Sequence, residues 1–67
     1  MEDWKKVYST DKMYKVNILK ALLAEENIET REISTKDSMF PIGGIEIYVD
    51  RKHLAKAQEI IENHQDL

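Results

Sequence analysis

The amino-acid sequence predicts a small α+β domain in which two helices cover one face of a three-stranded sheet. Three observations support this prediction. Two segments carry apolar residues at helical spacing, three shorter segments are rich in β-branched and aromatic residues, and their order along the chain is β-α-β-β-α. Each helix then has one apolar stripe to bury and each strand has one apolar face. Two packed layers satisfy both requirements.

Length and composition restrict the class of protein. The chain has 67 residues, enough for a single domain over 1–67, and its 42% hydrophobic and 34% charged residues are typical of a globular protein. It has no cysteine, so we expect neither a disulfide framework nor a thiolate metal site. Short apolar runs argue against a membrane span, and a net charge of −3 argues against nucleic-acid binding. Residues 1–4 do not form a signal peptide, which predicts a cytoplasmic protein.

The first two elements are expected to be a strand and a helix. Residues 4–8 contain aromatic and β-branched side chains and end at the polar residues 9–11, whose oxygen atoms can cap a helix. Apolar residues then recur at helical spacing over 12–26. Asn27 stands where helices commonly end in a left-handed turn. The apolar stripe consists of Val16, Leu19, Leu22 and Leu23, with Met13 and Ile18 at its borders.

The second half of the chain predicts two strands and another helix. Residues 28–34 are β-branched but carry charges on both faces, which favours an edge strand. Residues 35–44 are expected to form a long loop, and 45–49 alternate cleanly as a strand with one buried face. Asp50 is expected to cap a helix that runs to about Asn63. Its apolar stripe consists of Leu54, Ala57, Ile60 and Ile61.

These elements predict a truncated ferredoxin-like fold. The clean alternation of 45–49 suits the centre of the sheet, and the charges of 28–34 suit its edge. With a right-handed crossover through the first helix, this is the split β-α-β arrangement without a fourth strand. In this prediction the first and third strands are parallel neighbours, so both helices begin at the same end of the sheet. The expected core consists of Leu19, Leu23, Ile45, Ile47, Val49, Leu54 and Ile61.

The sheet face away from the helices is expected to be uncovered. Trp4, Tyr8 and Tyr48 are predicted to lie there, and an exposed aromatic patch of this kind often marks an interface. A weak homodimer is therefore one hypothesis, and a monomer in which Trp4 folds over the sheet edge is the alternative. In the long loop, Met39 and Phe40 either cap the small core or belong to a mobile recognition loop that extends the interface.

A group of cations forms the second candidate site. Each predicted helix begins with lysine or arginine and ends with acidic residues, which opposes the helix dipole. If both helices begin at one end of the sheet, these cations and the free backbone amides converge on a site for phosphate or carboxylate. Ordinary solvated charges are the alternative. The candidate residues are Ser9, Thr10, Lys12, Lys15, Arg51, Lys52 and His53.

The sequence contains no recognisable catalytic or metal-binding constellation. His53 and His64 would lie about 16 Å apart along one helix, too far to share an ion. Ser9 and Ser38 are predicted in turns, where serine usually serves backbone hydrogen bonding. The glycine pair 43–44 lacks a phosphate-loop pattern. We expect no catalytic residue, no metal and no cofactor.

Five stretches of the chain together resemble one known family. They are WKKVYS (4–9), ILKALL (18–23), ENIE (26–29), IEIYV (45–49) and AKA (55–57), and they resemble the DUF2007 family. That family is described as prokaryotic signal-transducing proteins with a fold similar to PII-type regulators and ACT domains. The resemblance implies a bacterial, non-enzymatic regulatory module that binds a small anionic ligand or a protein partner. The alternatives are a small enzyme acting on a phosphorylated or acyl substrate, and a structural homo-oligomerising domain.

Overall fold

Three strands and two α-helices make up the part of the chain that the computed structural model describes, residues 3–34 and 44–64. Their order agrees with the sequence prediction, with a short 3₁₀ turn added before the second helix. The elements are β1 (Trp4–Thr10), α1 (Met13–Glu25), β2 (Thr30–Ser34), β3 (Ile45–Asp50), η1 (Arg51–His53) and α2 (Leu54–Glu62).

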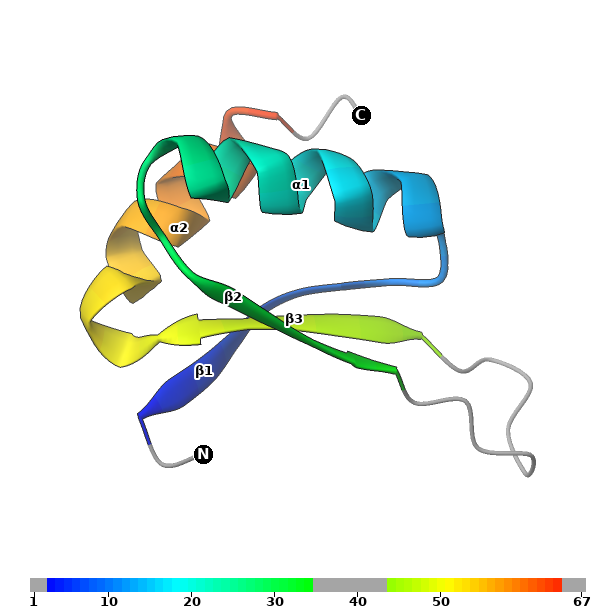
Figure 1. The fold of residues 1–67 in the computed structure, drawn as a ribbon, viewed down its shortest axis with the longest axis horizontal. Coiled ribbons are helices and arrows are strands. Elements are labelled where there is room, and N and C mark those ends of the chain that lie inside the picture. Colours follow the sequence, from blue (N-terminus) through cyan, green and yellow to red (C-terminus); the bar gives the residue numbers. More distant parts are fainter. Residues whose placement is uncertain (1–2, 35–43, 65–67) are drawn as a thin grey trace.

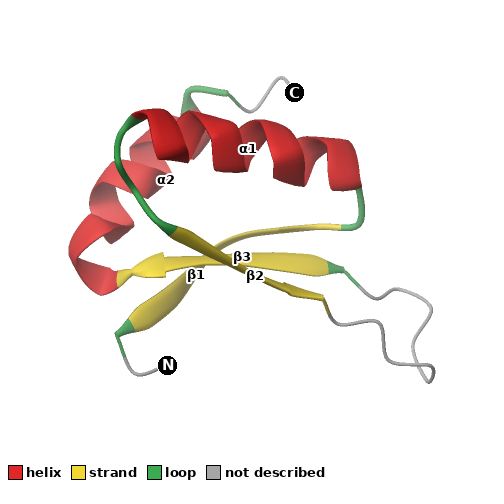
Figure 2. Ribbon diagram, in the orientation of Figure 1, coloured by secondary structure: helices red, strands yellow, loops and turns green. Residues whose placement is uncertain are grey.

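The sheet has the strand order β1-β3-β2, and both neighbouring pairs are antiparallel. The two helices pack on one face of this sheet and form the second layer (Figure 1 and Figure 2). The predictions of a central third strand and of a charged second strand at the edge are confirmed. The architecture is that of a small ferredoxin-like α+β fold.

The direction of β3 relative to β1 differs from the prediction. Strands β1 and β3 are antiparallel, with Trp4 opposite Asp50 and Thr10 opposite Ile45. The crossover through α1 makes β1 and β2 parallel to each other, and β3 returns antiparallel to both of them. Helix α1 follows the end of β1 and α2 follows the end of β3, so the helices begin at opposite ends of the sheet (Figure 1). The expectation of a common end is wrong.

A β-bulge interrupts the pairing of β1 with β3. Lys6 lies opposite Tyr48 and Tyr8 lies opposite Ile47, so Val7 is an extra residue on β1. Both Val7 and Tyr8 pack against the buried core on the helix side of the sheet. The prediction that Tyr8 lies on the uncovered face is wrong, because the extra residue shifts the alternation by one position.

The core lies between the sheet and the helices and forms two clusters, and Val7 packs against both of them. Most of the predicted core is buried, whereas Ile45 and Leu54 are only partly buried at its margins. One cluster consists of Val16, Leu19, Ile47 and Ile61, and the other consists of Leu23, Ile28, Val49 and Ala57. Val16 and Ala57 belong to the predicted apolar stripes, although the list of expected core residues did not name them, and the burial of Ile28 was not predicted.

The start of α1 differs from the prediction. No side chain caps this helix, and the Thr10 hydroxyl instead accepts a hydrogen bond from the Lys12 amide at 3.2 Å. The hydroxyl thus stabilises the turn before the helix. Asp50 does cap the turn that leads into α2, because its carboxylate accepts a hydrogen bond from the Lys52 amide at 2.9 Å. Neither described helix combines the length and the apolar character that crossing a membrane requires.

The end of α1 confirms the prediction at Asn27, which has a φ of 61°. The amide of Asn27 donates to the Ala24 carbonyl at 2.9 Å, and the amide of Ile28 donates to the Leu23 carbonyl at 3.0 Å. This pair of bonds is the Schellman motif, and Ile28 and Leu23 share a core cluster, as the motif favours. The same turn therefore ends α1 and places Ile28 in the core.

The two core clusters predict the cost of truncating a central side chain. Replacing Leu19, which is 2% exposed, with alanine should lower the free energy of unfolding by about 2–5 kcal/mol, because a buried cavity remains. The matched control is Ile18→Ala on the same helix, where the side chain is 37% exposed. Denaturant unfolding measures both changes. Equal losses in the two variants would contradict the core assignment.

The left-handed turn predicts opposite effects of two substitutions at Asn27. Asn27→Gly should leave stability unchanged or raise it, since glycine adopts positive φ without steric cost. Asn27→Ala should lower the free energy of unfolding by about 1 kcal/mol, because alanine lacks the short polar side chain that lets asparagine tolerate the left-handed conformation. Asn17→Ala, at an exposed position inside α1, is the control in the same denaturant experiment and should not be destabilising. A stable Asn27→Ala variant would contradict the role of this turn.

Candidate functional site

The candidate site is the face of the sheet away from the helices, here called the open face. On β3, Ile47 and Val49 are buried beneath the helices, so Tyr48 between them points to the opposite side. Its partners Lys6 on β1 and Arg31 on β2 share this side. Neither described helix lies over it (Figure 1). The open face consists of Trp4, Lys6, Ser9, Arg31, Ile33, Glu46, Tyr48 and Asp50.

Trp4 and Arg31 form a stacked pair that joins the two edge strands across β3. The guanidinium carbon of Arg31 lies 4.2 Å from the centroid of the Trp4 ring, a distance at which a cation–π interaction forms. Trp4 is half-buried although no described helix covers it. The prediction that Trp4 and Tyr48 lie on the open face is confirmed, and Arg31 is a member that the sequence reasoning missed.

Tyr48 belongs to a hydrogen-bonded network beside this pair. Its hydroxyl donates to Glu46 Oε1 at 3.1 Å, and Lys6 Nζ lies 3.4 Å from Glu46 Oε2. The hydrogen bond to Glu46 raises the pKa of Tyr48, with smaller contributions from burial and from the negative charge of Glu46, while Lys6 acts in the opposite direction. The phenol donates this bond at neutral pH and holds Glu46 in place.

The structure separates the seven residues of the predicted anion site into two groups. Residues 9–15, which include the candidate serine, threonine and lysines, precede or begin α1 at the end of the sheet where Thr10 pairs with Ile45. The candidates in 51–53 follow β3 at the opposite end, where the Arg51 amide donates to the Asp3 carbonyl at 2.6 Å. Antiparallel pairing of β1 and β3 thus prevents convergence. The separated candidates are Ser9, Thr10, Lys12 and Lys15, and Arg51, Lys52 and His53.

Several other candidates occupy local positions. His64 lies at the end of α2, and its ring nitrogen Nδ1 is 2.8 Å from the Ile60 carbonyl oxygen, which requires a proton on that nitrogen. Within residues 3–34 and 44–64, no group of three histidine, aspartate or glutamate side chains is placed to hold a metal ion. The predicted interface residues Met39 and Phe40, and Ser38, lie outside the described residues.

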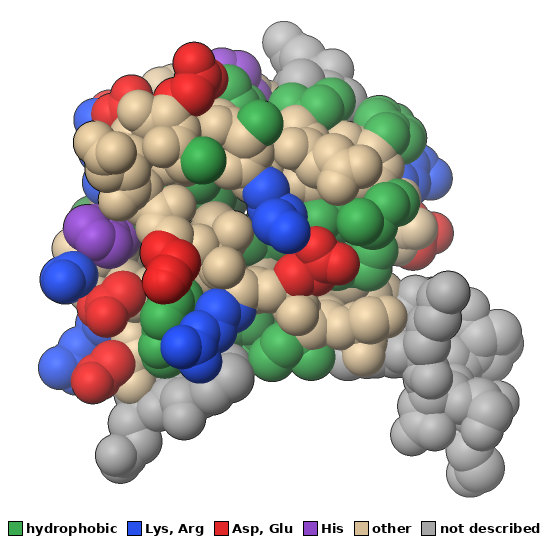
Figure 3. Space-filling model, viewed as in Figure 1, with side chains coloured by type: hydrophobic (Ala, Val, Ile, Leu, Met, Phe, Trp, Pro, Cys, Tyr) green, Lys and Arg blue, Asp and Glu red, His purple; other side chains and the backbone are tan. Residues whose placement is uncertain are grey.

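A second apolar surface lies along the outer side of α1. Hydrophobic side chains gather over this helix in the space-filling view, and charges of both signs are mixed around them (Figure 3). The large exposed members are Met13, Tyr14 and Ile18, and Tyr14 is 55% exposed. Unlike the open face, this surface has no stacked or hydrogen-bonded pair among residues 3–34 and 44–64 that fixes its side chains. Its exposed residues therefore serve as control positions for substitutions on the open face.

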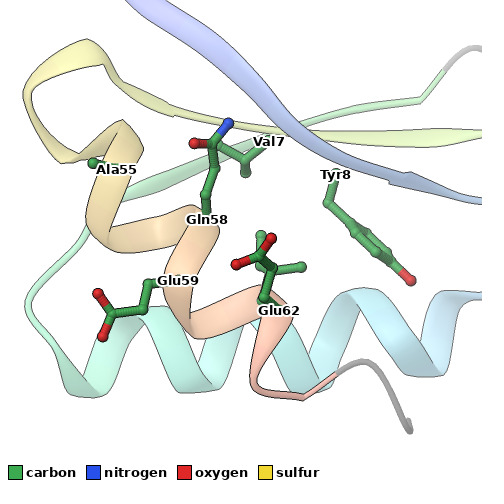
Figure 4. Close-up of a pocket in the computed structure, with 7 residues that line it drawn as sticks. Val7, Tyr8, Ala55, Gln58, Glu59 and Glu62 are labelled. Atoms are coloured by element: carbon green, nitrogen blue, oxygen red, sulfur yellow. The ribbon is translucent and has the colours of Figure 1, made fainter.

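A groove between β1 and α2 is a feature that sequence reasoning missed. Its volume is about 560 Å³. Val7 and Tyr8 form its β1 wall, and they reach it because the bulge turns both toward the helix side. Regular alternation in the sequence could not indicate this wall. The groove is lined by Val7, Tyr8, Ala55, Gln58, Glu59, Ile61 and Glu62 (Figure 4).

Comparison with known proteins matched the chain to a protein family. Residues 4–65 match the family model DUF2007, whose description is "Putative prokaryotic signal transducing protein". The searches of curated proteins and of solved structures found no match. The match covers every described strand and helix, and it includes the open face and the groove.

The network on the open face predicts the titration of Tyr48. Glu46→Gln should lower the pKa of Tyr48 toward the ordinary tyrosine value, because the charged acceptor that favours the neutral phenol is removed. The folded-state pKa lies above the unfolded one, so this bond stabilises the fold at neutral pH and is lost as pH rises through the Tyr48 pKa. NMR titration of the tyrosine rings measures the shift. Glu25→Gln on α1 is the control, and an equal Tyr48 titration in wild type and Glu46→Gln would contradict the assignment.

Proposed function

Because the chain belongs to the DUF2007 family, we propose that it is a non-enzymatic regulatory module of signal transduction that acts as a weak homodimer. The observation that carries the proposal is the group formed by Trp4, Arg31 and Tyr48 on the open face. The module needs no metal or cofactor for this role. The proposal places it in the bacterial cytoplasm.

The residue types on the open face support a protein interface. Binding energy at interfaces concentrates in tryptophan, tyrosine and arginine, and the open face holds one of each. The stacking of Arg31 on Trp4 and the bond from Tyr48 to Glu46 already order these side chains in the single chain. Less conformational entropy is lost on association when side chains are ordered beforehand.

The charge pattern of this face favours a second copy of the chain as the partner. A two-fold dimer presses the same patch against itself, so the patch must not carry an excess of one charge. The cations Lys6 and Arg31 balance the anions Glu46 and Asp50 on the open face, whereas the whole chain has a net charge of −3. Two copies therefore meet on this face with little electrostatic repulsion. The small area of a three-stranded face makes the dimer weak.

The geometry gives less support to the anionic ligand and to the phosphate-processing enzyme. Both hypotheses depend on cations from two helix starts acting together. The helix starts lie at opposite ends of the sheet, and the carboxylate of Asp50 already occupies the Lys52 amide at one of them. The open face does not depend on the helix starts, because pairing of the three strands already places its residues side by side.

The proposed dimer predicts concentration-dependent self-association. Sedimentation equilibrium from micromolar to millimolar protein should show a monomer–dimer equilibrium in the wild type. Trp4→Ala should raise the dissociation constant of the dimer at least about tenfold, because truncation removes an aromatic anchor and leaves Arg31 without its stacking partner. Circular dichroism of the variant establishes that it is folded.

The control for this experiment is Tyr14→Ala, which removes an exposed aromatic side chain from α1 instead of the sheet. This variant should associate as the wild type does. A wild-type protein that remains monomeric up to millimolar concentration would remove the proposal. Association that is weakened by Tyr14→Ala and not by Trp4→Ala would place the interface on α1 and would equally contradict it.

A further inference from the structure

We propose that the groove between β1 and α2 binds a small organic cation, an amine or guanidinium group attached to a short hydrocarbon body. This site is separate from the open face, since Val7 and Tyr8 lie on the helix side of the sheet. A volume of about 560 Å³ falls in the range of small-molecule pockets. The proposal concerns ligand binding and does not depend on the dimer.

The apolar part of the groove suits a hydrocarbon body. Val7, Ala55 and Ile61 contribute only aliphatic surface to the lining, and the ring of Tyr8 adds an aromatic wall. In the close-up, Tyr8 comes from β1 and stands across from α2 (Figure 4). A short hydrocarbon chain placed between these elements loses contact with water on both sides, which favours binding.

The polar part of the groove selects a positive charge. Among the described residues, its lining includes Gln58, Glu59 and Glu62 and no lysine, arginine or histidine. Glu62 and Gln58 reach from α2 toward β1, whereas Glu59 extends to the other side of the helix (Figure 4). A guanidinium or ammonium group beside Glu62 forms a charge-assisted hydrogen bond, and the Tyr8 ring adds a cation–π contact.

The Glu62 carboxylate is available for such a ligand. Within the described residues, each ion pair of the molecule uses another acid, and the side-chain carboxylates of Glu59 and Glu62 take part in no hydrogen bond or ion pair. The acid that pairs with a cation of α2 is Glu26, whose carboxylate lies 3.8 Å from Lys56 Nζ near the start of that helix. A cation in the groove therefore gains a carboxylate without breaking an existing pair.

The form of β1 favours a small molecule over an added strand of a partner protein. Within the described residues β1 pairs only with β3, so its outer side is a sheet edge. The bulge at Val7 distorts that edge, and Lys5 and Lys6 place charges on it, two features that oppose strand addition. The groove beside the edge stays accessible to a ligand that needs no backbone pairing.

The test is an NMR titration of the full chain with butylguanidinium as the probe. Saturable amide shifts are expected in residues 7–8 and 55–62, and Glu62→Gln should weaken the affinity at least about fivefold, because a hydrogen bond to a charged group is lost. Tyr8→Phe should bind as the wild type does, since the ring remains, and Tyr8→Leu should bind more weakly. The titration is repeated in Trp4→Ala, so that self-association does not affect the result.

Three controls define the result that would overturn the proposal. Glu25→Gln removes an unpaired acid from α1 and should leave the affinity unchanged. Butanol supplies the hydrocarbon without the charge, and citrate supplies the opposite charge, so neither should produce saturable shifts in the groove. Shifts that scatter over the surface, an unchanged affinity in Glu62→Gln, or an equal response to citrate would each exclude a cation site here.

Discussion

The extra residue at Val7 determines which surface each side chain of β1 joins. Before the bulge, Trp4 and Lys6 point to the open face; after it, Tyr8 packs on the helix side next to Val7 itself. With regular pairing, Tyr8 would lie beside Lys6 on the open face and the groove would lose its aromatic wall. A single irregularity in backbone pairing therefore produces two different surfaces from one short strand.

The two surfaces are close in sequence and separate in chemistry. The open face is balanced in charge and holds ordered aromatic and arginine side chains, whereas the groove is acidic with an apolar lining. Trp4 and Tyr8 are four positions apart on the same strand. If binding at one of these surfaces changes the affinity at the other, the effect is reciprocal and equal in free energy. The proposed signalling role requires such a link between input and output.

The sequence was sufficient for the elements and most of the core, because these follow from local periodicity and from single capping residues. Asn27 and Asp50 could be assigned from residue type alone, since left-handed turns and helix starts have strong preferences. The direction of β3 and the bulge at Val7 could not, because both depend on pairing between distant segments. Alternation along β1 misplaced Tyr8, and nothing in the sequence marks Arg31 as the partner of Trp4.

The opposed directions of the two helices shape the electric field of the molecule. Each helix carries cations near its start and acids near its end, and the antiparallel arrangement sets the basic start of one beside the acidic end of the other, as the 3.8 Å contact of Lys56 with Glu26 illustrates. The two gradients largely cancel as a dipole and leave a quadrupole-like field, which decays more steeply with distance. Beyond the effect of the net charge of −3, such a field gives little long-range steering to charged molecules around the protein, so it acts mainly at contact distance.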